Sequence, residues 1–232
     1  MASIDIEPIF KRSFSIFQDN VGLLLGLSIG GIVIGQIVGG IGAGAQLFIN
    51  IAAEQLDSDI QLIVIGIGAL IRMFFSLLAF IFNSYFGMSL IKISLRLVRG
   101  DTATFKDAII DFPMFIQGVL ANFLVGLVCG LGVLFCIVPG VILSLGLYMV
   151  LYLVVDKNMN AIDAIKGSWH MTDGSKLNLF LWLICCMVLS FVGLLACGVG
   201  VFVAMPVILL GNAIIYTSLS GGDQGNPLSL EK

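Results

Sequence analysis

Long uncharged stretches divide the chain into apolar blocks separated by short charged segments. Residues 20–53, 73–91, 112–155 and 177–222 contain no Asp, Glu, Lys or Arg. Because a transmembrane helix needs about 20 apolar residues, each of the two longest blocks accommodates two helices joined by a turn. Residues 20–91 supply a further pair, interrupted by an acidic loop and by Arg72. The pattern predicts an all-α integral membrane protein with about six transmembrane helices, arranged as three hairpins.

The overall composition supports a membrane protein and excludes an ordinary soluble domain. Hydrophobic residues make up 59% of the chain and charged residues only 11%, whereas soluble domains carry roughly 25% charged residues. The five cysteines lie in the apolar blocks without CxxC spacing, so we interpret them as small apolar side chains rather than a disulfide framework. The first apolar block is too long for a signal peptide, whose apolar region has about 7–15 residues. We therefore expect it to remain as the first span.

The basic residues lie almost entirely on one side of the predicted membrane. With six spans, ten of the eleven Lys and Arg residues fall on the side that carries both termini, and Arg72 is the exception. The opposite side carries Glu54, Asp57 and Asp59. Because short cytoplasmic loops are enriched in Lys and Arg, both termini and the loops at 99–111 and 156–176 are predicted to be cytoplasmic.

Two similar stretches indicate an internal repeat. Residues 129–133 and 197–201 share the order Cys-Gly-x-Gly-Val, and each stretch is followed by a proline, Pro139 or Pro206. An aspartate, Asp156 or Asp223, comes 17 residues after each proline. The Gly and Pro clusters at 130–140 and 198–206 are predicted to break the helices at the outer turns of two hairpins, 113–155 and 177–219.

A short amphipathic segment is expected before each hairpin. An apolar residue followed by Lys occurs at 10–11, 105–106 and 165–166, within segments that show helical apolar spacing. Such helices lie in the interface plane, with Lys toward the headgroups. We therefore predict three cytoplasmic interfacial helices, in which the residues that contact lipid are Lys11, Lys106, Lys166 and Trp169.

These segments define the predicted domain organisation. We expect a single membrane domain over residues 1–219 and a flexible C-terminal tail over 220–232. The repeat units within the domain would be about 4–98, 104–155 and 160–219. Because each unit spans the membrane an even number of times, the copies should run parallel about an axis near the membrane normal.

The first hairpin, residues 21–98, is longer than the other two, and its surplus is apolar. Arg72 and Lys92 bracket an uncharged stretch as long as one span, so we predict the second span at about 73–91. Residues 41–71 would then form an apolar extension on the outer side. The alternative is a span that begins at Ile60 and buries Arg72 near the midplane. Arg72 is accordingly either an interfacial anchor or part of a pathway.

Glycines recur every four residues in and beyond the first span. Small residues at this spacing let helix backbones approach closely, and packing drives helix association in lipid. We interpret them as a packing surface, either within one chain or between subunits. The residues are Gly22, Gly26, Gly30, Gly31, Gly35, Gly39, Gly40 and Gly44.

Residues that could carry catalysis or bind a metal are nearly absent from the predicted spans. No Asp, Glu or His lies in a span, which argues against proton-coupled transport. His170, the sole histidine, lies in a cytoplasmic segment without a cysteine near it in the sequence. We therefore expect neither an enzyme nor a cofactor, a metal site or a nucleic-acid partner.

The stretch over residues 137–174 resembles a bacterial family of multi-pass membrane proteins. A Pro-Gly turn, Pro139-Gly140, is followed by an amphipathic segment that contains Ser168, Trp169, Thr172 and Gly174. This order is similar to that of the YciC-like membrane proteins and of the membrane domain found beside glycerophosphoryl diester phosphodiesterases. The resemblance implies a helical protein of the bacterial cytoplasmic (inner) membrane. It implies no catalysis, because the sequence shows no soluble phosphodiesterase domain.

Two functional hypotheses follow from these patterns. The first is a non-enzymatic membrane protein that forms a homo-oligomer and organises or shapes the bilayer, with membrane lipids and further copies of the chain as partners. The interfacial segments, the glycines and the long apolar hairpin motivate it. The alternative is a channel or transporter with a path between the hairpin repeats.

Labelling of single cysteines in intact cells tests the predicted topology. A membrane-impermeant thiol reagent should react at position 57 without permeabilisation, and at positions 106 and 166 only after it. The physical reason is the retention of Lys and Arg on the cytoplasmic side. Strong labelling at 106 or 166 in intact cells, with none at 57, would reverse the orientation.

Overall fold

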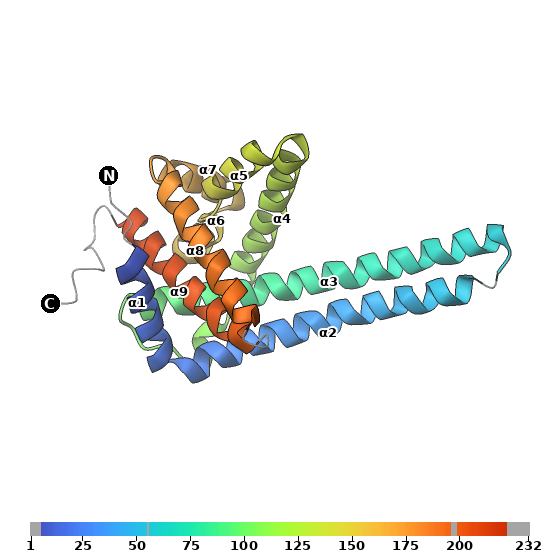
Figure 1. The fold of residues 1–232 in the computed structure, drawn as a ribbon, viewed down its shortest axis with the longest axis horizontal. Coiled ribbons are helices and arrows are strands. Elements are labelled where there is room, and N and C mark those ends of the chain that lie inside the picture. Colours follow the sequence, from blue (N-terminus) through green and yellow to red (C-terminus); the bar gives the residue numbers. More distant parts are fainter. Residues whose placement is uncertain (1–5, 55, 196–198, 222–232) are drawn as a thin grey trace. The chain divides into compact units, whose positions relative to one another are not determined.

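The computed structural model describes residues 6–54, 56–195 and 199–221, and this part of the chain is almost entirely helical (Figure 1). Its helices are α1 (Ile6–Asp19), α2 (Val21–Ala53), α3 (Ser58–Val98), α4 (Phe112–Phe135), α5 (Ile137–Gly146), α6 (Val150–Lys157), α7 (Ala161–Thr172), α8 (Lys176–Leu195) and α9 (Val199–Ser220). Six segments are long and apolar enough to cross a membrane: α2, α3, α4, α5 together with α6, α8 and α9. The predicted all-helical architecture with six candidate membrane spans is confirmed for the described residues. The predicted tail beyond 221, with Asp223, and the repeat residues Cys197 and Gly198 lie outside the described residues.

The helices form two compact units. One is the hairpin unit, Ile29–Phe86, which contains most of α2 and the larger part of α3. The other, here called the bundle unit, consists of Met1–Ser28 and Gly87–Lys232. Each unit is built by a different kind of packing.

In the hairpin unit, α2 and α3 pair antiparallel through glycines. A Cβ atom added to Gly35 would lie 2.6 Å from the amide oxygen of Asn83, closer than atoms in real structures approach, so the two backbones are as near as glycine permits. The same register continues along the arms. The facing pairs are Gly31 with Phe86, Gly35 with Asn83, Gly39 with Ala79, Gly42 with Phe75, and Gly68 with Ile49.

The two arms belong to helices that are longer than a bilayer is thick. α2 has 33 residues and α3 has 41. At a rise of 1.5 Å per residue, these are about 50 Å and about 60 Å long, whereas the hydrocarbon core measures about 30 Å. Arg72 lies inside α3, which continues without a break to Val98.

In the bundle unit, pairs of glycines bring the arms of two hairpins together near their turns. A Cβ atom on Gly132 of α4 would lie 3.1 Å from the Cα atom of Gly140 in α5. A Cβ atom on Gly193 of α8 would lie 2.9 Å from the carbonyl carbon of Gly200 in α9. Each glycine pair lies near the turn of its hairpin, but Gly132 and Gly200, which match in the repeat, lie on the first arm of one hairpin and on the second arm of the other.

The prolines in these two clusters behave differently. The first cluster breaks the helix as expected, since α4 ends at Phe135 and α5 begins at Ile137. Pro206 instead lies inside α9, which begins at Val199. The prediction that the second cluster breaks the helix up to Pro206 is therefore wrong. Proline removes one backbone donor, and α9 keeps its course here because it packs against both α1 and α8.

The second arm of the α4 hairpin is interrupted between α5 and α6. α5 ends at Gly146 and α6 begins at Val150, whose N–H donates to the Leu147 carbonyl. From α7, the Ser168 hydroxyl donates to the Gly146 carbonyl at 2.8 Å and accepts from the Met149 N–H at 3.2 Å. One buried side chain thereby satisfies a carbonyl and an amide at the break, as apolar surroundings require.

The residues on which the predicted family resemblance rests complete this contact. The Thr172 hydroxyl also donates to the Gly146 carbonyl, at 3.3 Å. The Trp169 ring packs on Gly146 so closely that no Cβ atom would fit there. Gly174, with a φ of +79°, turns the chain from α7 toward α8 in a conformation that favours glycine. The resembling stretch is therefore the part of the chain that holds a broken helix together.

The segments that precede the hairpins differ from one another. α1 is an amphipathic helix that packs on α9 and buries Ile9, Ser13 and Phe17. The second segment is a single 3₁₀ turn, Phe105–Ala108, where the sequence predicts a helix. The Asp107 carboxylate accepts hydrogen bonds of 2.8 Å from the N–H and the hydroxyl of Thr104, which closes a tight turn instead. The third segment is α7.

Replacing Ser168 tests whether its hydroxyl stabilises the interruption between α5 and α6. Ser168→Ala leaves a buried carbonyl and a buried amide with fewer partners, and each such group costs about 1–3 kcal/mol. We expect a clear fall in the unfolding temperature in mild detergent. Ser13→Ala is the matched control, because Ser13 is equally buried but donates to Ile9 within its own helix. Equal losses from both variants would show that the break does not depend on Ser168.

Candidate functional site

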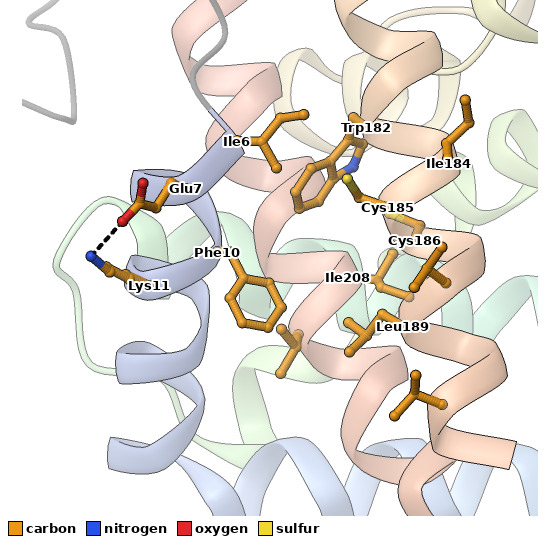
Figure 2. A pocket seen from close by; sticks show the side chains of 13 residues that line it. Ile6, Glu7, Phe10, Lys11, Trp182, Ile184, Cys185, Cys186, Leu189 and Ile208 are labelled. Atoms are coloured by element: carbon orange, nitrogen blue, oxygen red, sulfur yellow. Dashed lines mark hydrogen bonds and ion pairs between the residues drawn. The ribbon is translucent and has the colours of Figure 1, made fainter. Parts of the chain in front are cut away.

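An apolar groove lies between α1, α8 and α9 in the bundle unit (Figure 2). Its volume is about 620 Å³, within the range of about 300–1,000 Å³ that is usual for ligand cavities. Figure 2 shows Phe10 of α1 on one side and Cys185, Cys186 and Leu189 of α8 on the other, with Ile208 of α9 between them. Walls of this chemistry suit a hydrocarbon ligand.

A charged pair on α1 borders the groove. Lys11 Nζ lies 2.7 Å from Glu7 Oε1, one helical turn away, and both residues line the groove. Their side chains are 74% and 79% exposed. The hydrogen bond from Lys11, together with its charge, lowers the pKa of Glu7 from its ordinary value. A negative and a positive group therefore lie side by side on α1 at neutral pH, and Figure 2 shows their charged ends at the edge of the helix, beside the groove rather than in its wall.

The indole of Trp182 forms part of the groove wall, and hydrogen bonds fix it in place. Trp182 Nε1 donates to Asn212 Oδ1 at 2.7 Å, and the hydroxyl of Tyr148 donates to the same oxygen at 3.0 Å. The ring also packs against Gly211, where no Cβ atom would fit. The polar edge of the indole is thus satisfied inside the bundle, and the residue, which is 2% exposed, contributes only a small part of its surface to the groove wall.

The bundle contains a second polar contact at the end of α6. The Tyr216 hydroxyl donates to Asp156 Oδ2 at 2.9 Å, and Arg99 lies 2.6 Å from Asp156 Oδ1. Tyr152 stacks on Tyr216 with ring centroids 5.5 Å apart. The charge of Asp156 is therefore both paired and hydrogen-bonded. We interpret this contact as a structural one that joins α6 to α9 and to Arg99, the residue after α3.

The predicted glycine surface divides into two groups. Gly31, Gly35 and Gly39 face α3 within the hairpin, and Gly26 faces Phe105. A Cβ atom added at the remaining positions would have no neighbouring atom within 4 Å. These open positions are Gly22, Gly30, Gly40 and Gly44.

Arg72 lines a polar notch in the hairpin unit. The notch has a volume of about 530 Å³, and its polar lining consists of Gln46, Asn50, Arg72 and Ser76. Gln46 Nε2 donates to Asn50 Oδ1 at 2.7 Å, while the buried Gln46 Oε1 has no hydrogen-bond partner among the described residues. The structure thus brings Arg72 together with amides that lie far from it in the sequence.

The remaining predicted lipid-contact residues lie on separate elements. Lys106 is exposed on the 3₁₀ turn and Lys166 is exposed on α7. Trp169 is half-buried on Gly146, and the Lys176 ammonium lies 4.1 Å from the centre of one of its rings. Much of the Trp169 side chain is therefore packed against protein. Of the four predicted lipid-contact residues, only Lys11 lines the groove.

Sequence reasoning missed the groove and the two polar contacts. In the sequence, Asn212 is one of several amides scattered through the apolar blocks, and Tyr148 and Tyr216 belong to no recognisable motif. The spacing of Tyr148 and Tyr152, one helical turn apart, gave a weak signal that both lie on one face. Their partners on α8 and α9 could not be found, because the pairing of distant helices is not encoded at short range.

Comparisons with known protein families, with curated proteins and with solved structures find no match to this chain. The resemblance inferred from residues 137–174 stays a prediction. Within the described residues, no group of three or more His, Cys, Asp and Glu side chains could hold a metal ion.

A disulfide tests the observed hairpin register. The Cβ position of Gly39 lies 3.8 Å from the Cβ atom of Ala79, which matches the separation of about 3.5–4.5 Å in disulfides. In a chain whose native cysteines are replaced by Ala, Gly39→Cys with Ala79→Cys should cross-link under mild oxidation. Adding Gly35→Leu should reduce the yield severalfold, because the arms are forced apart. Gly40→Leu, at an open position, should not. Efficient cross-linking of a pair offset by two residues, and not of this pair, would show a different register.

Proposed function

We propose that copies of this chain associate through the hairpin unit and that the homo-oligomer organises or shapes the bilayer, without catalysing a reaction. The observation that carries the proposal is a stripe of exposed apolar side chains on α3, at helical spacing and 52–64% exposed. The stripe consists of Ile63, Ile67, Leu70, Phe74 and Leu77. A second stripe on α2 consists of Ile37, Ile41, Phe48 and Ile51.

Helix geometry supports placing part of these stripes outside the hydrocarbon. Arg72 and Lys92 are 20 residues apart on one helix, which corresponds to about 30 Å, the thickness of the hydrocarbon core. If they mark its two boundaries, the start of α3 extends about 20 Å beyond the outer one. Large apolar areas rarely remain exposed to water, and closed assemblies of like subunits are a common cover.

The open glycines support contact between subunits rather than within one. Gly40 and Gly44 lie on α2 beside the exposed Ile37, Ile41 and Phe48, and nothing in the hairpin covers them. Small residues flanked by apolar side chains suit the close approach of a neighbouring helix in lipid. Gly31, Gly35 and Gly39 perform the equivalent task inside the hairpin.

In the proposed arrangement the protein lies in the bacterial inner membrane, with both termini cytoplasmic. α1 and α7 lie at the cytoplasmic interface, since each precedes a hairpin and carries a Lys toward the headgroups. The three hairpins then enter from the same leaflet. This places the acidic tip of the first hairpin, with Asp57 and Asp59, on the outer side.

The polar notch at Arg72 favours the alternative of a channel or transporter. A charged side chain at membrane depth is a functional hypothesis by default, and Gln46 and Asn50 would offer further polar groups along a path. Arg72→Gln should then lower ion or solute flux in liposomes while leaving the particle mass unchanged. If the protein is a scaffold, the unsubstituted chain should itself show no ion or solute flux in liposomes.

The mass of purified particles tests the proposed oligomer. Gly40→Leu with Gly44→Leu should lower the mass seen by light scattering in mild detergent and in nanodiscs, because bulky side chains separate neighbouring hairpins. The Gly39–Ala79 cross-link should still form, which shows that the hairpin itself is intact. Replacing residues 45–68 by a short Gly-Ser linker should have the same effect on mass. A wild-type monomer in both environments would overturn the proposal.

A further inference from the structure

We propose that the groove between α1, α8 and α9 is a binding site for a phospholipid with a zwitterionic ethanolamine headgroup. One acyl chain would occupy the groove, the phosphate would lie at Lys11, and the ammonium would lie at Glu7. The proposal concerns the bundle unit and does not depend on association of the hairpins.

The groove has the chemistry and the size of an acyl-chain site. The polar atoms nearest its wall are already engaged, since Trp182 Nε1 and the Tyr148 hydroxyl both donate to Asn212. A ligand therefore gains little from hydrogen bonds inside the groove and much from burial of hydrocarbon. A volume of about 620 Å³ leaves room for a chain rather than for a single side chain.

The length of the groove matches one leaflet. On α8 its lining runs from Trp182 to Val192, ten residues and hence about 15 Å along the helix. This is half of the hydrocarbon thickness of about 30 Å. α8 and α9 are both candidate spans, so the groove opens toward lipid and not toward an aqueous compartment.

The charged pair distinguishes between lipid headgroups. Glu7 and Lys11 lie one turn apart on α1 and present a carboxylate and an ammonium side by side. An ethanolamine phospholipid carries a phosphate and an ammonium and can pair with both, and its ammonium can donate N–H hydrogen bonds to Glu7, which the trimethylated ammonium of a choline lipid cannot. A lipid with an anionic headgroup would meet Lys11 favourably but Glu7 unfavourably. The two charges together therefore favour a zwitterionic partner, although a lone Lys11 would favour an anionic one.

Fluorescence quenching tests the site directly. The chain has two tryptophans, so Trp169→Phe leaves Trp182 as the reporter in the groove wall. In nanodiscs of phosphatidylcholine, phosphatidylethanolamine with brominated acyl chains should quench Trp182 in a saturable way at low mole fraction. Brominated phosphatidylglycerol should need an about two- to fivefold higher mole fraction, the effect of one exposed charge pair.

Two variants and one control assign the result to the groove. Val188→Phe, which fills the groove from α8, should remove the saturable phase, whereas Leu181→Phe, an exposed position of α8 outside the groove lining, should not. Glu7→Gln should reverse the headgroup preference toward phosphatidylglycerol, because the carboxylate that repels an anionic headgroup is then absent. Native mass spectrometry of the unsubstituted chain should show retained phosphatidylethanolamine, which Val188→Phe reduces.

Each contrary outcome overturns a stated part of the proposal. Quenching that rises in proportion to mole fraction and ignores Val188→Phe would show ordinary boundary lipid and no site. Saturable quenching that is equal for both headgroups and unchanged by Glu7→Gln would leave an acyl-chain groove but refute headgroup recognition by the charged pair.

Discussion

The hydroxyl of Ser168 joins the two ends of a broken membrane helix, and the polar centre of the bundle unit depends on it. By binding the Gly146 carbonyl and the Met149 N–H, it holds α6 at a fixed offset from α5. Tyr148 lies within this break and reaches Asn212, which in turn fixes Trp182. Trp182, which is 2% exposed, is one of the residues that line the groove. A single buried hydroxyl is thus connected, contact by contact, to the surface proposed to bind lipid.

Glycine is used in two ways in this chain. Where its Cβ position is already filled, as at Gly35 against Asn83 or Gly193 against Gly200, it allows two helices of one chain to touch. Where its Cβ position is open, as at Gly40 and Gly44, the same property is available to a partner. Both uses follow from the absence of a hydrophobic driving force in lipid, where close packing decides which helices associate.

Most of the charged side chains in the described residues are either exposed or paired with an opposite charge. Asp156 is 12% exposed but pairs with Arg99 and accepts from Tyr216. Glu7 and Lys11 pair at the surface of α1, and Arg96 pairs with Asp107 beside the 3₁₀ turn. Arg72 differs, because it lines a notch whose buried amide oxygen, on Gln46, has no partner in the described part of the chain. The paired charges at exposed sites contribute little to stability, and the groove and the notch are the places where a ligand or a partner could add contacts.

The pattern of apolar and charged residues was sufficient to predict an all-helical chain with six candidate spans. Transfer of apolar residues into lipid depends on composition along one segment, and so does not require knowledge of neighbouring helices. The amphipathic character of α1 was equally readable. The 3₁₀ turn at Phe105–Ala108 was not, because the bonds between Thr104 and Asp107 compete locally with helix formation. Other features could be seen only in the folded chain. Ser168 binds Gly146, and Trp182 and Tyr148 share Asn212. Gly35 faces α3, whereas Gly40 faces away from it. Such contacts depend on which helices pack and in what register, and those choices arise from many weak contacts between segments far apart in the chain.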